Sequence, residues 1–157
     1  MTPRPDDAPP TVDGPLDPWR ASARIGRQLG AWSIASVLLG TALLAFADGA
    51  TARAFGLQCL VWGAIDGGIA LAGAIALRRA HARGAVDDPQ EAPGERRRLR
   101  RLLWINAGLD VGYVAAGLLL VALWRTPDGL GHGLGVLVQG GFLLVFDAVH
   151  ARRLRER

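Results

Sequence analysis

The sequence predicts an all-α membrane protein with four transmembrane helices arranged as two hairpins. Three observations support this fold class: four long apolar segments, arginine residues gathered beside them, and a polar pattern shared by the second and fourth segments. Half of the residues are hydrophobic and the mean hydropathy is +0.22, although a fifth of the residues are charged. A chain of 157 residues then has too little polar sequence to cover four apolar helices in water.

The four apolar segments are long enough to cross a bilayer. A hydrocarbon core of about 30 Å requires roughly 20 helical residues at 1.5 Å each. The predicted spans are residues 29–47, 54–77, 102–124 and 130–149, with a connection at 80–100. Together they form one transmembrane domain over residues 24–154.

Both ends of the chain are predicted to lie outside this domain. Residues 1–23 are rich in proline and aspartate, which predicts a disordered tail, and residues 155–157 form a short C-terminal tail. Residues 45–47 (Ala-Phe-Ala) resemble a signal-peptide cleavage site, so cleavage of the first span is an alternative. The long acidic, proline-rich segment before this span and the length of its apolar run favour a retained helix.

The arginine residues predict the orientation of the helices. All eighteen basic residues are arginine, and the two short connections hold only Arg53 and Arg125. The positive-inside rule therefore places both termini and the connection 80–100 in the cytoplasm. The expected partners are the bilayer and anionic lipid headgroups at this arginine-rich face, and we expect no nucleic-acid partner.

The second and fourth spans share a polar pattern. Gln58 precedes Asp66 by the same interval as Gln139 precedes Asp147. A two-helix unit repeated head to tail would give two parallel repeats, which predicts an internal duplication. Asp66 lies near the middle of its span, whereas Asp147 lies near the arginine-rich end of its own, so a strict duplication would need staggered spans.

Carboxyl groups inside the predicted spans are the main functional indication, because an Asp at a helix centre costs about 2.5–3.5 kcal/mol on insertion scales. Asp66 is the deepest. We expect it to be protonated or hydrogen-bonded by Gln139, which should lie at a similar depth. A neutral Asp66 could carry a proton or could simply join two helices, and the joining role is our leading interpretation.

The third span carries polar residues on one helical face. Asn106, Asp110, Tyr113 and Gly117 recur at helical spacing, so their side of the helix should face inward. The functional alternative is a polar cleft open to the cytoplasm, with Asp110 as a base or cation ligand. The structural alternative is a hydrogen-bonded seam against a neighbouring span, which we favour.

No catalytic residue, metal site or cofactor is predicted. Asp147 and His150 should lie side by side on the fourth helix, but two ligands are too few for a metal site, and a capped helix end explains them. The sequence has no nucleophile elbow, phosphate loop or HExxH motif. Cys59 is the single cysteine, so no intramolecular disulfide can form.

Glycine pairs spaced four residues apart suggest close helix packing. Gly63 and Gly67 form one pair in the second span, and Gly131 and Gly135 form another in the fourth. Such pairs let helix backbones approach closely, either within the bundle or between copies in a homo-oligomer.

Three strings resemble a family of small bacterial four-span membrane proteins whose function is uncharacterised. The strings are LQCLVWGAID, NAGLDVGY and GLGVLVQGGFLLVFDAVHARR, and the resemblance covers about residues 28–154. It implies four spans in a bacterial inner membrane but brings no activity. The residues that carry it are Gln58, Trp62, Asp66, Asn106, Asp110, Tyr113, Gln139, Asp147 and His150.

Three hypotheses for function follow. The leading one is a non-enzymatic membrane bundle, structural or accessory, in which the polar residues specify packing. The alternative is a small proton- or cation-coupled transporter or channel that uses Asp66 and Asp110, and it requires a water-accessible cleft reaching Asp66. A third is a lipid-modifying enzyme that works through Asp147 and His150.

Overall fold

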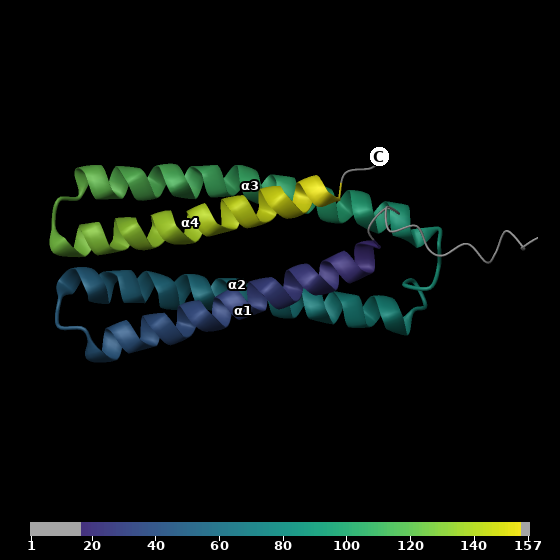
Figure 1. The fold of residues 1–157 in the computed structure, drawn as a ribbon, viewed down its shortest axis with the longest axis horizontal. Coiled ribbons are helices and arrows are strands. Elements are labelled where there is room, and N and C mark those ends of the chain that lie inside the picture. Colours follow the sequence, from purple (N-terminus) through teal and green to yellow (C-terminus); the bar gives the residue numbers. More distant parts are fainter. Residues whose placement is uncertain (1–16, 155–157) are drawn as a thin grey trace, which may run out of the picture.

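The computed structural model describes residues 17–154, which form four helices running antiparallel to one another along the chain (Figure 1). The helices are α1 (Pro18–Phe46), α2 (Ala50–Ala82), α3 (Glu91–Leu123) and α4 (Pro127–Arg153). Each is long and apolar enough to cross a membrane. The prediction of four apolar helices is confirmed. The arginine-rich end of the bundle holds the α2–α3 connection, and the opposite end holds the two short connections.

Local sequence signals set the helix ends. The Asp17 side chain accepts a hydrogen bond from the backbone N–H of Trp19 at 3.0 Å, and Pro18 begins α1. Thr126 accepts from the N–H of Gly129 at 3.1 Å and precedes the proline that begins α4. Both arrangements satisfy a free N–H group at a helix start. After α2 the chain turns at Gly84, whose φ of 73° lies in the left-handed region that favours glycine.

The helices extend beyond the predicted spans at the arginine-rich end. Residues 18–23 belong to α1 although we assigned them to the N-terminal tail, and much of the predicted connection 80–100 is helical. Hydropathy marks the length that can cross a bilayer, whereas arginine and glutamate continue a helix without being apolar. The remaining tail residues, 1–16 and 155–157, lie outside the described residues.

Glycine contacts close each hairpin. A Cβ atom on Gly40 of α1 would lie 2.6 Å from the carbonyl oxygen of Gly56 and from the amide nitrogen of Leu60 on α2. A Cβ atom on Gly117 of α3 would lie 2.7 Å from the amide nitrogen of Leu137 on α4. The backbones within each hairpin therefore touch with no side chain between them, as in other close helix pairs.

The two hairpins meet through α2 and α4 near the short connections. Gly131 of α4 packs directly on the backbone of Thr51, whose hydroxyl donates to the carbonyl of Pro127 at 2.9 Å, and Gly135 packs on Gln58. At the arginine-rich end, α1 joins α3 and α4 in an apolar cluster that includes Leu103.

The predicted glycine pairs are used inside one chain. Gly63 and Gly67 pack on Ser33 of α1, and Gly131 and Gly135 pack on α2. These four positions are therefore filled by neighbouring helices of the same bundle.

The bundle has apolar side chains on its surface and polar side chains inside. Leu38 is 65% exposed and Val145 is 64% exposed, and many other large apolar side chains of the four helices are also exposed. The buried polar and charged residues are Ser33, Ser36, Asp66, Asp110, Gln139 and Asp147. Water-soluble bundles have the opposite arrangement.

Candidate functional site

Three aspartates from three helices line one cavity of the bundle. Its volume is about 160 Å³. Asp66 of α2, Asp110 of α3 and Asp147 of α4 line it, although they are far apart in the sequence. The other lining residues are Leu29, Trp62, Ile65, Ile69, Asn106, Leu109, Tyr113 and Leu143.

The carboxyl groups of this cavity are buried and incompletely hydrogen-bonded. Asp66 is 1% exposed, Asp110 is 3% exposed and Asp147 is 6% exposed. Within residues 17–154, the Oδ2 atoms of Asp66 and Asp110 have no hydrogen-bond partner. A buried polar atom without a partner costs about 1–3 kcal/mol, so native structures contain few of them. The fold therefore does not use these two oxygens to hold helices together.

Helical spacing brings the α3 residues to the cavity. Asn106, Asp110 and Tyr113 all line it, because positions three and four residues apart share a helix face. Gly117, the fourth residue of this pattern, instead provides the close contact with α4. The Tyr113 ring meets the Trp62 ring edge to face, with centroids 4.8 Å apart, so two aromatic rings lie beside the carboxyl groups.

A larger cavity lies between this site and the arginine-rich end. Its volume is about 380 Å³, and all four helices line it. It shares Leu29, Ile69, Asn106 and Asp147 with the smaller cavity, so the two cavities are adjacent. We call them together the acidic cleft.

Charged side chains lie at the outer end of the acidic cleft. Arg83, Glu95 and Arg98 line it there, and Arg98 pairs with Glu95 at 3.6 Å. A solute approaching from the arginine-rich end would pass these side chains before it reached the aspartates.

The acidic cleft is suited to positive charge. Three ionised carboxylates around one small space would repel one another strongly at low dielectric, so uptake of protons or of a cation would relieve that repulsion. The faces of Trp62 and Tyr113 could also attract an organic cation. Among residues 17–154, no group of three or more histidine, cysteine, aspartate or glutamate side chains is placed to hold a metal ion.

Gln139 does not hydrogen-bond to Asp66, so this one of the two alternatives expected for Asp66 is wrong. Its side-chain oxygen accepts from the indole N–H of Trp32 at 2.9 Å, and its amide donates to the Ser36 hydroxyl at 3.3 Å. Asp147 follows Gln139 by eight residues, which is about 80° around a helix. Gln139 therefore faces α1, whereas Asp147 faces the acidic cleft.

Gln58 also lies away from the acidic cleft. Its side-chain amide nitrogen is 3.0 Å from Nδ1 of His132 on α4. The His132 ring in turn stacks on Trp124, with centroids 5.7 Å apart. Gln58 and Gln139 thus each bridge from one hairpin to the other.

His150 is not paired with Asp147. Its Nδ1 lies 2.7 Å from the carbonyl oxygen of Phe146, and its Nε2 lies 2.9 Å from Oε1 of Gln28 on α1. His150 is thus engaged by its own helix and by α1. Asp147 lines the acidic cleft, whereas His150 is not among its lining residues.

Sequence reasoning missed the α1 residues that form hydrogen bonds with other helices. Trp32 and Ser36 bind Gln139, and Ser33 donates to the carbonyl of Gly63 at 2.7 Å. Trp32 and Ser36 are four residues apart, so they share one face of the first span, and this spacing is the signal that could have identified them.

Gln139→Leu should destabilise the bundle, because it leaves the Trp32 N–H and the Ser36 hydroxyl without their buried partner. We expect a loss of about 1–2 kcal/mol in the free energy of unfolding, measured by thermal unfolding of the purified protein. Gln90→Leu is the control, since Gln90 is exposed in the α2–α3 connection and should have little effect. Equal losses in the two variants would contradict a structural role specific to Gln139.

Comparison with known proteins identifies a family for this chain. No curated protein and no solved structure matches it. A family model matches residues 28–148, which include all of the aspartates of the acidic cleft. The chain therefore belongs to the family of unknown function DUF6992.

Proposed function

We propose that this protein is an integral protein of the bacterial inner membrane that crosses the bilayer four times. Two observations support the proposal: the four helices have the required length and composition, and the surface of the bundle is apolar. The distribution of arginine supports a cytoplasmic location for both termini and for the α2–α3 connection. The acidic cleft then opens toward the cytoplasm.

Within this membrane protein, we assign the acidic cleft to the binding and transfer of protons or a small cation, without enzymatic chemistry. One observation carries this proposal. Asp66 and Asp110 bring carboxyl oxygens without protein partners to the cavity that Asp147 also lines. Burying a carboxyl group in a membrane costs free energy. Two carboxyl oxygens without hydrogen-bond partners at the end of a cleft are therefore better explained by a ligand than by helix packing.

A purely structural role fits other polar residues better. Gln139 and Gln58 make hydrogen bonds between the hairpins, and Ser33 makes one within a hairpin. These bonds specify how the helices pack, as we proposed for the whole polar set from the sequence. The orphaned oxygens of Asp66 and Asp110 make no comparable bond.

The two hairpins are proposed to be related by duplication. Asp66 and Asp147 line the same cavity, and Gln58 and Gln139 each reach across to the opposite hairpin. Equivalent roles at equivalent positions support a common two-helix ancestor with parallel repeats.

Proton transfer can be tested in reconstituted vesicles. We expect vesicles with wild-type protein to dissipate an imposed pH gradient faster than empty vesicles do. Tetramethylammonium is added as the probe for a cation whose movement is coupled to that of protons. A pH-sensitive dye inside the vesicles reports the rate. Asp66→Asn should lose most of this activity, since an amide cannot exchange a proton or balance a cation.

Asp48→Asn is the matched control, because it makes the same chemical change at an exposed position between α1 and α2. It should behave as wild type. The proposal fails if wild-type and empty vesicles lose the gradient equally fast, with and without tetramethylammonium, or if Asp66→Asn keeps full activity.

A further inference from the structure

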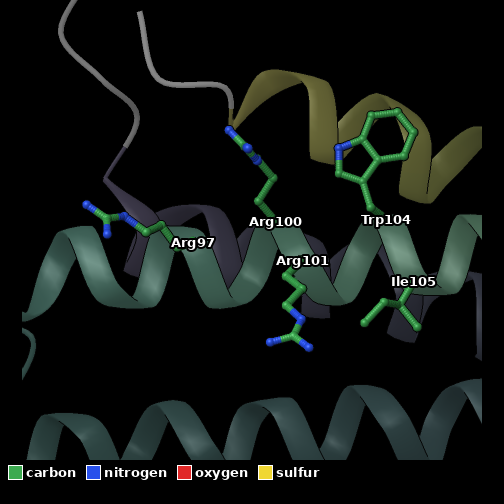
Figure 2. A pocket seen from close by; sticks show the side chains of 5 residues that line it. All are labelled: Arg97, Arg100, Arg101, Trp104 and Ile105. Carbon is green, nitrogen blue, oxygen red and sulfur yellow. The ribbon is translucent and has the colours of Figure 1, made fainter.

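A second hollow lies on α3, outside the acidic cleft. Its volume is about 540 Å³, and five residues near the arginine-rich end line it (Figure 2). They are Arg97, Arg100, Arg101, Trp104 and Ile105. None of them lines the acidic cleft, so the function proposed for that cleft leaves this hollow unexplained.

The spacing of these residues places charged side chains next to apolar side chains. Arg100 and Trp104 are four residues apart and project from one edge of α3, and Arg101 and Ile105 project from the other edge in this view (Figure 2). The two pairs are about 100° apart around the helix, and both line the same hollow. Each pair thus places a guanidinium group next to an apolar side chain that lies farther from the arginine-rich end.

Arg100 and Arg101 are available for an external anion. Within residues 17–154, neither forms an ion pair with a carboxylate, and the nearby Glu95 pairs instead with Arg98. Arg101 is exposed and Arg100 is half-buried. Guanidinium groups bind phosphate oxygens through two parallel hydrogen bonds, which makes arginine well suited to phosphate.

The position of the hollow along α3 matches a membrane surface. Arg97 to Trp104 covers about 10 Å of helix at 1.5 Å per residue, comparable with the roughly 5–8 Å headgroup layer on each side of a bilayer. Trp104 is 45% exposed, and tryptophan side chains prefer this interface. The arginines would therefore lie at the level of the lipid phosphates, with Trp104 and Ile105 next to the first acyl carbons.

We infer that this hollow binds the phosphate group of an anionic phospholipid, through the guanidinium groups of Arg100 and Arg101, with the acyl chains against Trp104 and Ile105. The inference rests on the proposed membrane insertion but not on the acidic cleft. It goes beyond a general attraction of the arginine-rich face to anionic lipids, because it specifies one saturable site.

Native mass spectrometry of the full-length protein, released from neutral detergent, tests this site. Dioleoylphosphatidylglycerol is the probe, and dioleoylphosphatidylcholine is the zwitterionic control lipid. We expect wild type to retain one phosphatidylglycerol molecule at concentrations where phosphatidylcholine is lost. The double variant Arg100→Gln/Arg101→Gln should bind phosphatidylglycerol about tenfold more weakly.

The double variant Arg152→Gln/Arg153→Gln removes the same charge from exposed positions at the end of α4 and should bind as wild type. Equal weakening in both double variants would show diffuse attraction and overturn the site. Displacement of the lipid by millimolar inorganic phosphate would overturn the lipid assignment in favour of free phosphate. If the first double variant does not fold, Arg101→Gln alone, at an exposed position, must weaken binding for the inference to stand.

Asp66→Asn should retain normal lipid binding. Failure of the cation proposal and failure of the lipid inference would thus be seen in different measurements.

Discussion

Gly40→Leu should lower the free energy of unfolding by about 3 kcal/mol or more, because a side chain there must push α1 away from α2. The atoms in its way are the backbone oxygen of Gly56 and the backbone nitrogen of Leu60, each 2.6 Å from the position of the new Cβ. Backbone atoms cannot rotate aside as a flexible side chain can. Thermal unfolding in detergent, followed by helical circular dichroism, would measure the loss.

Gly68→Leu is the control for this prediction. Gly68 lies exposed on α2, and a Cβ atom there would meet no atom within 4 Å. Since leucine favours a helix by up to about 1 kcal/mol over glycine, stability should be unchanged or higher. If both leucine variants lost stability to the same extent, the close approach at Gly40 would not explain the effect.

Asp66→Asn and Asp110→Asn are expected to leave the bundle as stable as wild type or to stabilise it by up to about 2 kcal/mol each. Each replacement removes a carboxyl group whose Oδ2 atom has no protein partner, and it reduces the repulsion around the cavity. Asparagine has nearly the same size and can donate as well as accept, so the packing should be retained. Most substitutions of buried polar residues destabilise, which makes this direction informative.

The number of helices and the location of their apolar segments could be predicted from the sequence, because bilayer thickness sets a minimum apolar length. The helix ends were harder to predict from the sequence. Asp17 caps α1 and Pro18 begins it, well before the apolar residues. Hydropathy does not detect such a capping residue and proline.

The gathering of three aspartates was only partly predictable. The periodicity of Asn106, Asp110 and Tyr113 identifies one inward face of α3. That Asp66 and Asp147 line the same cavity depends on how α2 and α4 cross, and this crossing is set by glycine contacts between hairpins. No rule of local sequence specifies such a long-range contact.

The partner of Gln139 shows the same limit. Similar depth in the membrane suggested Asp66, but depth does not determine the direction in which a side chain points. The rotation of about 80° between Gln139 and Asp147 directs the glutamine to Trp32 and the aspartate to the acidic cleft. Angular position on each helix must therefore be considered together with depth.

The thermal unfolding of Asp66→Asn and Asp110→Asn beside wild type, with Gln139→Leu as a reference for a structural residue, tests the central claim most directly. The claim is that the aspartates of the acidic cleft bind a ligand, whereas Gln139 stabilises the fold. It predicts that both asparagine variants melt at or above the wild-type temperature while Gln139→Leu melts below it. If both asparagine variants melt as far below wild type as Gln139→Leu does, the aspartates are structural and the claim is contradicted.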